Sequence, residues 1–529
     1  MSDLGDLDIP LFDPPAVLHG DPREVLESVF GYREFRPGQR HIIDAVLAGR
    51  DCIGVMPTGA GKSLTFQIPA KMLPGPVLVI SPLISLMKDQ VDALTRIGFK
   101  ATVLNSSVDF EERRKRLGAL RRGEVELVYV APEGLEGSLR GILADCGPSL
   151  VVVDEAHCIS HWGHDFRPAY RRLQGLKAEC GDNPVLALTA TATRRVVGDI
   201  IRQLGMRKPE GFKGSFFRHN LHITAHRKGG VGAAKRDMRR DLLGILRRHR
   251  GESGIVYCMS RRAVESLTGW LVERGVKAAP YHAGLDDRAR TANQDAFARD
   301  EVDVVVATVA FGMGIDKSNV RFVVHRDMPK SIEAWYQEIG RAVRDGLPSD
   351  CVLMYSWADV IGYEAFLDHI DNPAQRQETK QKTIELFRLV DRRGCRHQGL
   401  VRHFDETMEP CGTSCDVCRG TTIADLVAGG DHGVERSGRA SKPDRSTAID
   451  HPELFERLRA LRKRLADAEG VPAYIVFSDA VLRGMASTLP RTRQDLATIP
   501  GIGPVKLERY GRVFLEEIAE ELRRLQPPA

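Results

Sequence analysis

The chain has 529 residues, a length that predicts about three or four domains and excludes a single small module. Hydrophobic residues make up 42% of it and charged residues 28%, which excludes a globally disordered chain and a membrane-embedded one. The net charge of +5 is too small to indicate a nucleic-acid partner by itself. The first residues lack the basic and apolar stretches of a secretory signal, so we expect a cytoplasmic protein with no membrane partner.

Two stretches of the chain alternate short β-branched runs with longer helical patterns, as parallel sheets with crossover helices do. Next come a helical stretch that ends in a cysteine cluster, a segment rich in Gly, Asp, Arg and Ser that is typical of a linker, and a compact helical pattern. These patterns predict a tail over 1–20, a first α/β lobe over 21–210, a second over 211–349, a helical region over 350–418, a linker over 419–451 and a small all-α domain over 452–526.

The segment from Met56 to Ser63 predicts a P-loop, because it follows an apolar strand pattern and precedes a helical one. Its glycines let backbone N–H groups close around phosphate oxygens, while Lys62 supplies positive charge and Ser63 a ligand for Mg²⁺. Met56 stands where the strict pattern has its first glycine, and a Gly-rich turn without a ligand is the alternative. The nucleotide-binding residues predicted here are Thr58, Gly59, Gly61, Lys62 and Ser63.

Two adjacent acids, Asp154 and Glu155, follow the apolar run over 150–153. Acids at the carboxyl end of such a strand project toward the crevice in which open α/β sheets bind ligands. We expect Asp154 to hold Mg²⁺ through water and Glu155 to orient and deprotonate the attacking water. A solvated loop is the alternative for an isolated Asp-Glu pair, but a P-loop about ninety residues upstream favours catalysis.

Arg341 and Arg344 lie three residues apart in a helical pattern of the second stretch, so they would share one helix face. Such arginines can stabilise the charge that develops on a transferred phosphoryl group. Taken from the residues alone, two surface arginines are the alternative.

The order of these elements resembles that of superfamily 2 helicases, and further motifs between about residue 20 and residue 418 narrow the resemblance to the RecQ family. The segment over 31–39 resembles the family's adenine-recognition motif, in which Tyr32, Arg36 and Gln39 would contact the base. A glutamine amide can pair with both a donor and an acceptor on adenine, which favours ATP over GTP. The resemblance assigns catalysis to Lys62, Asp154, Glu155, Gln337, Arg341 and Arg344, and nucleotide binding also to Asp316.

Other motifs resemble those with which RecQ helicases hold DNA. The most discriminating one is the aromatic-rich loop over 160–170, where Trp162 and Phe166 offer faces on which unpaired bases can stack and Arg167 can reach a phosphate. A buried aromatic cluster is the alternative. The DNA-binding residues implied for the two lobes are Ser81, Lys88, Asn105, Trp162, Phe166, Arg167 and Thr308.

Cys395, Cys411, Cys415 and Cys418 offer four soft ligands at a spacing that suits tetrahedral Zn²⁺. Four thiolates leave no open coordination position, so the site would be structural rather than catalytic. A disulfide is one alternative, and His397 and His403 are competing fourth ligands. RecQ proteins carry a similar site, although the spacing expected there is one residue shorter, and Val343 replaces a glycine expected in the arginine motif.

The C-terminal stretch over 452–526 resembles the HRDC domain of RecQ proteins. Its Gly501-Ile-Gly503 sequence resembles a helix-hairpin-helix turn, whose N–H groups can meet a DNA phosphate with Lys506 adding charge, or which can serve packing alone. Between residues 418 and 452 a typical RecQ protein would hold a winged-helix domain of roughly one hundred residues. The 33 residues present are too few for one, which puts efficient unwinding in doubt.

The resemblance implies an α/β fold with two tandem RecA-like parallel-sheet lobes, a helical zinc-binding subdomain and a small all-α HRDC-like domain. It implies an ATP-dependent DNA helicase that uses ATP, Mg²⁺ and Zn²⁺, translocates 3′ to 5′ and unwinds duplex or branched DNA in recombination and repair. Its partners would be single-stranded and branched or duplex DNA, with single-strand-binding or recombination proteins as candidates. It would associate with the nucleoid in a bacterium, while its oligomeric state has no signal in the sequence.

Three other functions stay open at this point. An ssDNA-dependent translocase with poor unwinding would follow from the missing winged helix. An RNA helicase would share the two lobes, although the aromatic-rich loop and the cysteines argue against it. A DNA-binding or annealing scaffold with a vestigial nucleotide site is disfavoured by intact Lys62, Asp154, Glu155, Arg341 and Arg344.

Overall fold

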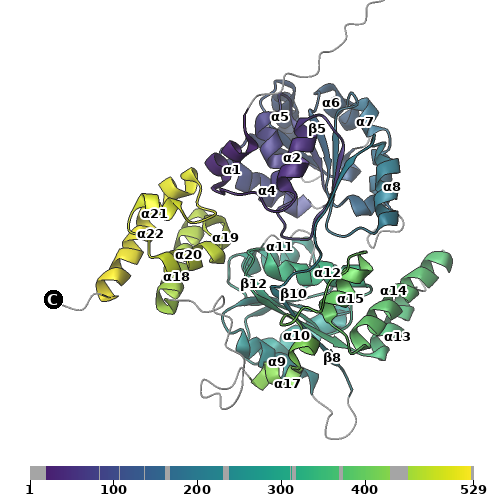
Figure 1. Ribbon diagram of the computed structural model, residues 1–529, viewed down its shortest axis with the longest axis vertical. Coiled ribbons are helices and arrows are strands. Elements are labelled where there is room, and N and C mark those ends of the chain that lie inside the picture. The colour runs from purple at the N-terminus through teal and green to yellow at the C-terminus, as the bar shows by residue number, and fades with distance from the viewer. Residues whose placement is uncertain are drawn as a thin grey trace, which may run out of the picture.

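The computed structural model describes two α/β lobes and two helical regions (Figure 1). The expected tail lies outside the described residues except for Gly20. The residues described are 20–82, 84–105, 108–135, 138–160, 167–229, 237–309, 311, 317–367, 373–428 and 451–525.

The first lobe is built on a seven-stranded, wholly parallel sheet with the order β3-β4-β2-β5-β6-β1-β7. Its central strands are short apolar runs buried on both faces, because helices cover the sheet from both sides. The strands are β1 (Cys52–Val55), β2 (Val77–Ile80), β3 (Ala101–Leu104), β4 (Leu127–Val130), β5 (Leu150–Val153), β6 (Val185–Thr189) and β7 (Glu210–Lys213). The helices are α1 (Pro22–Phe30), α2 (Gln39–Leu47), α3 (Leu64–Met72), α4 (Ile84–Arg96), α5 (Phe110–Arg121), α6 (Ser138–Asp145), α7 (Leu176–Glu179) and α8 (Arg194–Leu204).

The second lobe has a six-stranded parallel sheet with the order β10-β11-β9-β12-β13-β8. Its strands are β8 (Leu221–Arg227), β9 (Ser253–Tyr257), β10 (Ala278–Tyr281), β11 (Val304–Ala307), β12 (Val320–His325) and β13 (Ser349–Tyr355). Its helices are α9 (Met238–Arg248), α10 (Arg261–Val272), α11 (Asp287–Ala298) and α12 (Ile332–Ile339). Two tandem parallel-sheet lobes are therefore present, as the sequence predicts.

The apolar runs of the sequence predict β1, β2, β4, β5 and β6 of the first sheet and β9, β10, β11 and β12 of the second, but not β3, β7, β8 or β13. β3 and β7 are edge strands with half-exposed residues, so they carry no continuous apolar run. β8 is also an edge strand, with polar residues in its second half. β13 extends the second sheet to Tyr355, so the helical region starts later than the predicted residue 350.

The helical region begins with α13 (Trp357–Leu367) and α14 (Pro373–Asp391), which Figure 1 shows side by side at the edge of the second lobe. α15 (Arg396–His403) and α16 (Asp416–Arg419) follow. The predicted linker over 419–451 is wrong at its start, where α17 (Ile423–Ala428) forms. Ile423 is buried and Val427 lies against Gly244 of α9, so the apolar face of this short helix is covered by the second lobe. Residues 429–450 lie outside the described part of the chain.

The C-terminal domain, residues 451–525, is wholly helical in the structure. Its core contains the fully buried residues Leu458, Phe477, Leu482 and Phe514. Its helices are α18 (Pro452–Glu469), α19 (Ala473–Val476), α20 (Asp479–Thr488), α21 (Arg493–Ala497) and α22 (Pro504–Leu525). Across the described residues of the whole chain, none of the helices has the length and apolar character that a membrane span needs.

Candidate functional site

The P-loop lies between β1 and α3 at the carboxyl edge of the first sheet. Gly59 and Gly61 both have a φ of 80°, a conformation that favours glycine. A Cβ at Gly61 would also lie 2.4 Å from Nε2 of Gln39, so a side chain cannot be accommodated there without displacing that amide. These glycines leave the loop backbone open to approach by phosphate.

Met56, which replaces the first glycine of the pattern, is fully buried in the core of the first lobe. Its side chain therefore belongs to the hydrophobic core, and its carbonyl accepts a hydrogen bond of 3.3 Å from Nζ of Lys62. Methionine at position 56 therefore does not displace Lys62 from the loop. When a nucleotide binds, the Lys62 ammonium can leave the Met56 carbonyl and bind a phosphate oxygen instead.

The two acids follow β5 directly. Burial and the neighbouring Glu155 raise the pKa of Asp154 well above its usual range, although Lys62 opposes this shift. A carboxylate in such surroundings is stabilised by a nearby cation, so this donor set fits Mg²⁺. Ser63, the second predicted ligand, accepts a long hydrogen bond of 3.5 Å from Gln90.

Glu155 has a φ of 47°, in the left-handed region that residues other than glycine rarely adopt. Its carboxylate lies 3.3 Å from Nδ1 of His157, which is also 2.9 Å from the hydroxyl of Thr189 on β6. Tyr170 donates a hydrogen bond of 2.8 Å to the Asp154 carbonyl. The strained backbone at Glu155 is therefore held from both sides, which is typical of a residue that must point at a ligand.

The predicted adenine segment contacts the P-loop. Gln39 is buried, accepts a hydrogen bond of 2.8 Å from the Arg36 N–H through Oε1, and donates one of 2.9 Å to the Gly61 carbonyl through Nε2. Arg36 also donates to the Gly59 carbonyl. Tyr32 is 37% exposed. To bind adenine, the Gln39 amide would have to give up its present hydrogen bonds to the protein backbone and form new ones to the base.

The second lobe lies against the nucleotide site through the end of α12. Gln337 donates a hydrogen bond of 3.2 Å to the hydroxyl of Thr191 in the first lobe. A Cβ at Gly340 would lie 3.3 Å from the Thr58 side chain, so the backbone after α12 directly faces the P-loop. Arg218 donates to the Thr58 carbonyl and its pKa is lowered by burial.

The two predicted arginines lie just after α12, which ends at Ile339. The helix predicted to carry both arginines is replaced there by a 3₁₀ turn over Gly340–Val343, in which residues three apart align. The residues that flank this turn, Ile339 and Arg344, both have a φ of −67°. Arg341 lies beside the buried Tyr257 of its own lobe, where burial raises the pKa of the phenol and Arg341 opposes that shift.

Three of the predicted DNA-binding residues follow the carboxyl ends of strands, and Lys88 lies on a helix. Ser81 and Asn105 follow β2 and β3 and are buried, Thr308 follows β11 and is half-buried, and Lys88 on α4 is exposed. Arg167 donates a hydrogen bond of 3.2 Å to the Pro82 carbonyl, which connects the end of the aromatic-rich loop to the segment at Ser81. The predictions for Trp162, Phe166 and Asp316 lie outside the described residues.

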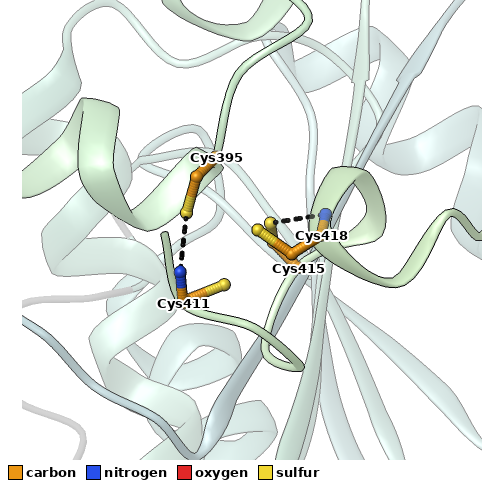
Figure 2. Close-up of side chains that lie close together, drawn as sticks. All are labelled: Cys395, Cys411, Cys415 and Cys418. Atoms are coloured by element: carbon orange, nitrogen blue, oxygen red, sulfur yellow. Dashed lines mark hydrogen bonds between the residues drawn. The ribbon is translucent and has the colours of Figure 1, made fainter. Parts of the chain in front are cut away.

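Figure 2 shows the four cysteines converging on one point from two parts of the chain. Their four Sγ atoms all lie within 4.8 Å of one another, close to the separation of about 3.8 Å that a tetrahedron with Zn–S bonds of about 2.3 Å requires. Although burial raises it, hydrogen bonds from the Cys411 and Gln398 N–H groups bring the pKa of Cys395 below its ordinary value. This donor set fits Zn²⁺, and all four cysteines are free of disulfides.

The competing histidine ligands are excluded by their contacts. Nε2 of His397 lies 3.0 Å from the Leu221 carbonyl and 3.3 Å from that of Ser414. His403 lies 2.9 Å from a carboxylate oxygen of Glu333 on α12. Neither imidazole belongs to the cysteine cluster.

The zinc centre is attached to β8, the edge strand of the second sheet. The Ile223 N–H donates a hydrogen bond of 2.9 Å to the Ser414 carbonyl, and Ile223 forms a parallel bridge with Cys415. Asp416 accepts two hydrogen bonds, of 2.9 and 3.0 Å, from Arg396 in a buried ion pair. The metal centre therefore covers an open sheet edge.

The zinc-bearing region also contacts the segment that joins the two lobes. Phe404 stacks on Phe216 with ring centroids 4.2 Å apart, and Glu406 accepts a hydrogen bond of 2.7 Å from the Phe216 N–H. Lys213 at the end of β7 donates to the Phe404 carbonyl. The region thus supports the connection between lobes.

Lys506 and the Gly501-Ile-Gly503 turn lie in the C-terminal domain. Lys506 is half-buried, its ammonium lies 5.8 Å from the ring centroid of Phe477, and burial lowers its pKa to about 8. The Gly501 N–H donates a hydrogen bond of 3.2 Å to the Gly31 carbonyl. In this arrangement the turn contacts the first lobe.

Arg218 contacts the P-loop although no motif in the sequence predicts this. It lies in the segment between strands β7 and β8 and belongs to no nucleotide-binding motif. Only the tertiary arrangement places it against Thr58.

Four protein-family models match consecutive parts of the chain, in the same order as the regions of the fold. The DEAD/DEAH box helicase model matches residues 36–200, and the helicase conserved C-terminal domain model matches residues 235–346. The RecQ zinc-binding model matches residues 357–419, and the HRDC domain model matches residues 451–518. Together with the fold, these matches define a two-lobed, ATP-hydrolysing helicase with a zinc-binding region and an HRDC domain.

Curated relatives narrow this class. The chain is 38% identical to ATP-dependent DNA helicase RecQ of Pasteurella multocida, covering 96% of this chain and 95% of that protein. It is 35% identical to the protein of the same name from Bacillus subtilis, covering 94% and 98%. The chain belongs to the RecQ family of ATP-dependent DNA helicases.

A solved structure supports the fold. The crystal structure of DUF1998 helicase MrfA bound to DNA matches with a TM-score of 0.53 at 19% identity, over 71% of this chain and 57% of that one. As a RecQ-family enzyme, the protein hydrolyses ATP with Mg²⁺, acts on DNA and carries Zn²⁺ at its four cysteines.

Proposed function

We propose that this enzyme couples ATP hydrolysis to 3′-to-5′ movement along single-stranded DNA and thereby unwinds duplex or branched DNA in recombination and repair. The observation that carries the proposal is the pair of contacts from Gln337 to Thr191 and from Arg218 to Thr58. Because both lobes supply groups to one nucleotide site, hydrolysis there changes how the lobes hold each other, and a bound strand can be moved stepwise.

The residues take distinct roles in this proposal. Lys62 and the loop backbone bind the phosphates, with Tyr32, Arg36 and Gln39 at the base and Asp316 completing the nucleotide site. Ser63 and Asp154 would hold Mg²⁺, which would supply positive charge against the phosphates. Glu155 accepts the proton of the attacking water, and Gln337, Arg341 and Arg344 stabilise the transition state.

DNA would cross the carboxyl edges of both sheets. Ser81, Lys88, Asn105 and Thr308 contact its backbone there, and the 160–170 loop carries Trp162, Phe166 and Arg167 to the bases. We assign the first lobe to 21–210, extended to residue 213 by β7, and the second lobe to 211–349, extended to residue 355 by β13. The zinc-binding region, placed at 350–418 from the sequence, then begins after β13, and the HRDC-like domain is assigned to 452–526. Single-strand-binding and recombination proteins at the nucleoid are the proposed partners.

Replacement of Lys62 tests the nucleotide site. Lys62→Ala should reduce ATP turnover by at least about a thousandfold, because the γ-phosphate loses its point charge, while binding of a single-stranded oligodeoxynucleotide is kept. Lys100→Ala, an exposed lysine beside β3, is the control. Turnover of the Lys62 variant at the control rate would contradict the assignment.

A second candidate is a translocase that unwinds poorly. The alignment to the P. multocida protein spans 607 positions, more than the 529 residues of this chain, so that relative has residues without a counterpart here. A missing duplex-gripping domain would lower strand separation but leave strand-stimulated hydrolysis intact. Strand displacement on forked, 3′-tailed and blunt DNA, measured beside ATP turnover with DNA and RNA oligomers, separates this candidate and an RNA helicase from the main proposal.

A further inference from the structure

The C-terminal domain contacts both lobes at once. On the first lobe, Gly501 and Gly503 lie against Gly31, where an added Cβ would lie 2.4 Å from the Gly503 nitrogen. On the second lobe, Arg459 donates a hydrogen bond of 2.7 Å to the Gly251 carbonyl, and Lys463 donates one of 2.9 Å to the Arg299 carbonyl. Figure 1 shows this domain, in yellow-green to yellow, at the left of both lobes and next to α1 of the first.

The contact on the first lobe lies next to the predicted adenine segment. Gly31 is the residue before Tyr32, and a Cβ at Gly501 would lie 3.7 Å from the Tyr32 ring and hydroxyl. A Cβ at Gly503 would lie 3.1 Å from the Val29 carbonyl, a tight contact, and the 2.4 Å distance at Gly31 leaves no room for a side chain there. The turn therefore covers one side of Tyr32.

This contact uses an N–H group that a DNA phosphate would need. The Gly501 N–H donates a hydrogen bond to the Gly31 carbonyl. One N–H group cannot donate fully to a carbonyl and to a phosphate oxygen at the same time. Contact with the first lobe and phosphate binding by the turn are therefore mutually exclusive.

The contact on the second lobe is polar and incompletely satisfied. Asp300 pairs with the buried Lys317, close to Arg459 and Arg462, and its pKa is lowered to about 2 against the opposing effect of burial. Among the described residues, Nε and Nη1 of Arg321, Nε of Arg462 and Nε of Arg483 are buried without hydrogen-bond partners. Buried polar atoms without partners cost free energy, so this interface is weaker than an apolar one of equal area.

We propose that the C-terminal domain restrains the motor by bridging its two lobes, and that a single-stranded DNA phosphate competes with Gly31 for the Gly501-Ile-Gly503 turn and releases it. In the bridged form, movement of the lobes against each other is limited and ATP turnover is low. Release frees both the lobes and the side of Tyr32 that the turn covers. The inference rests on the proposed function, because DNA is the releasing ligand.

Two sets of variants in the full-length protein test the bridge from its two ends. Arg459→Glu with Lys463→Glu removes both donors to the second lobe, and Gly503→Val places a side chain against the Val29 carbonyl. Arg464→Glu, an exposed arginine on the same helix α18, is the matched control. Thermal unfolding of each variant checks that the domain still folds.

The readouts are steady-state ATP turnover without DNA and hydrogen exchange of residues 22–32, each with and without oligo-dT. We expect both sets of variants, but not the control, to raise turnover without DNA by about fivefold, the low end of typical coupling between sites. We also expect 22–32 to lose protection in these variants, and in the wild type when oligo-dT is added. If one set of variants fails to fold, the set at the other lobe carries the test.

Two results would overturn the bridge. One is turnover of both folded variants at the control rate, and the other is unchanged protection of 22–32 in the wild type with oligo-dT while turnover rises. The second also separates this inference from the proposed function, which would stand. If oligo-dT stimulates neither the wild type nor the variants, the proposed function fails and the bridge fails with it.

Discussion

The zinc centre and the nucleotide site are both recognised from short motifs, but they are assembled differently. All four cysteines come from one segment over 395–418, and their sulfur atoms converge within 4.8 Å. The nucleotide site is divided: Lys62 and Glu155 belong to the first lobe, while Gln337 and Arg341 belong to the second. A local motif therefore determines the metal centre almost alone, whereas the catalytic site depends on how two lobes are placed.

The arginine pair tests the divided site most strongly. Arg341→Ala and Arg344→Ala should each lower the kcat of ATP hydrolysis by about a thousandfold with little change in nucleotide affinity, because an arginine finger acts mainly on the transition state. Arg388→Ala, an exposed arginine on α14, is the control. If one of the two variants keeps its kcat, that arginine only contacts its own lobe, and Arg341 beside Tyr257 would then be structural.

Loss of one zinc ligand tests the undivided site. Cys415→Ser should reduce bound zinc from about one ion per chain to none and lower the free energy of unfolding by several kcal/mol, because metal binding contributes directly to folding. Cys146→Ser, a free and partly exposed cysteine of the first lobe, should keep its zinc. Elemental analysis and denaturant unfolding are the measurements. Full zinc in the Cys415 variant would show that three cysteines and another ligand suffice.

The buried ion pair behind the zinc centre should have a smaller effect. Asp416→Asn leaves the Arg396 guanidinium buried without its carboxylate partner. The free energy of unfolding should fall by about 3 kcal/mol, because a buried charge without a partner is strongly destabilising. Zinc content should be retained, because Asp416 is not a ligand. Unfolding at the wild-type midpoint would mean that solvent reaches the pair.

The contact across the lobes should have the smallest effect. Gln337→Ala removes the single hydrogen bond to Thr191 and should lower kcat by about fivefold, the equivalent of about 1 kcal/mol. Gln381→Ala on α14, whose amide bonds only within its helix, is the control. A loss as large as that of the arginine variants would show that Gln337 contributes as much to the transition state as either arginine.

The sequence alone predicted the features that depend on neighbouring residues. The P-loop, the acids after β5 and the four cysteines are local patterns, and the two parallel-sheet lobes follow from repeated apolar runs. Strands β3, β7 and β8 were missed because edge strands need no continuous apolar run, and α17 was missed because Ile423, Leu426 and Val427 are few among polar neighbours.

Other features depend on residues far apart in the chain. No spacing connects Arg218 to Thr58, or Gly501 to Gly31, so their contacts follow only from the tertiary structure. Gln90 lies two residues after the predicted DNA-binding Lys88, yet it donates a hydrogen bond to Ser63 of the P-loop and accepts one of 2.5 Å from Tyr129. It therefore lies between the predicted DNA path and the Mg²⁺ ligand, a position that the sequence did not indicate. The roles of Trp162, Phe166 and Asp316 stay predictions.

The central claim is that one nucleotide site, shared by two lobes, is coupled to a DNA strand at their carboxyl edges. Its most direct test is the steady-state rate of ATP hydrolysis by the zinc-loaded, full-length enzyme, measured with increasing single-stranded oligodeoxynucleotide. The account predicts a saturable rise in rate that is abolished by Lys62→Ala and by either arginine variant. A rate that stays constant at every concentration of DNA would contradict it.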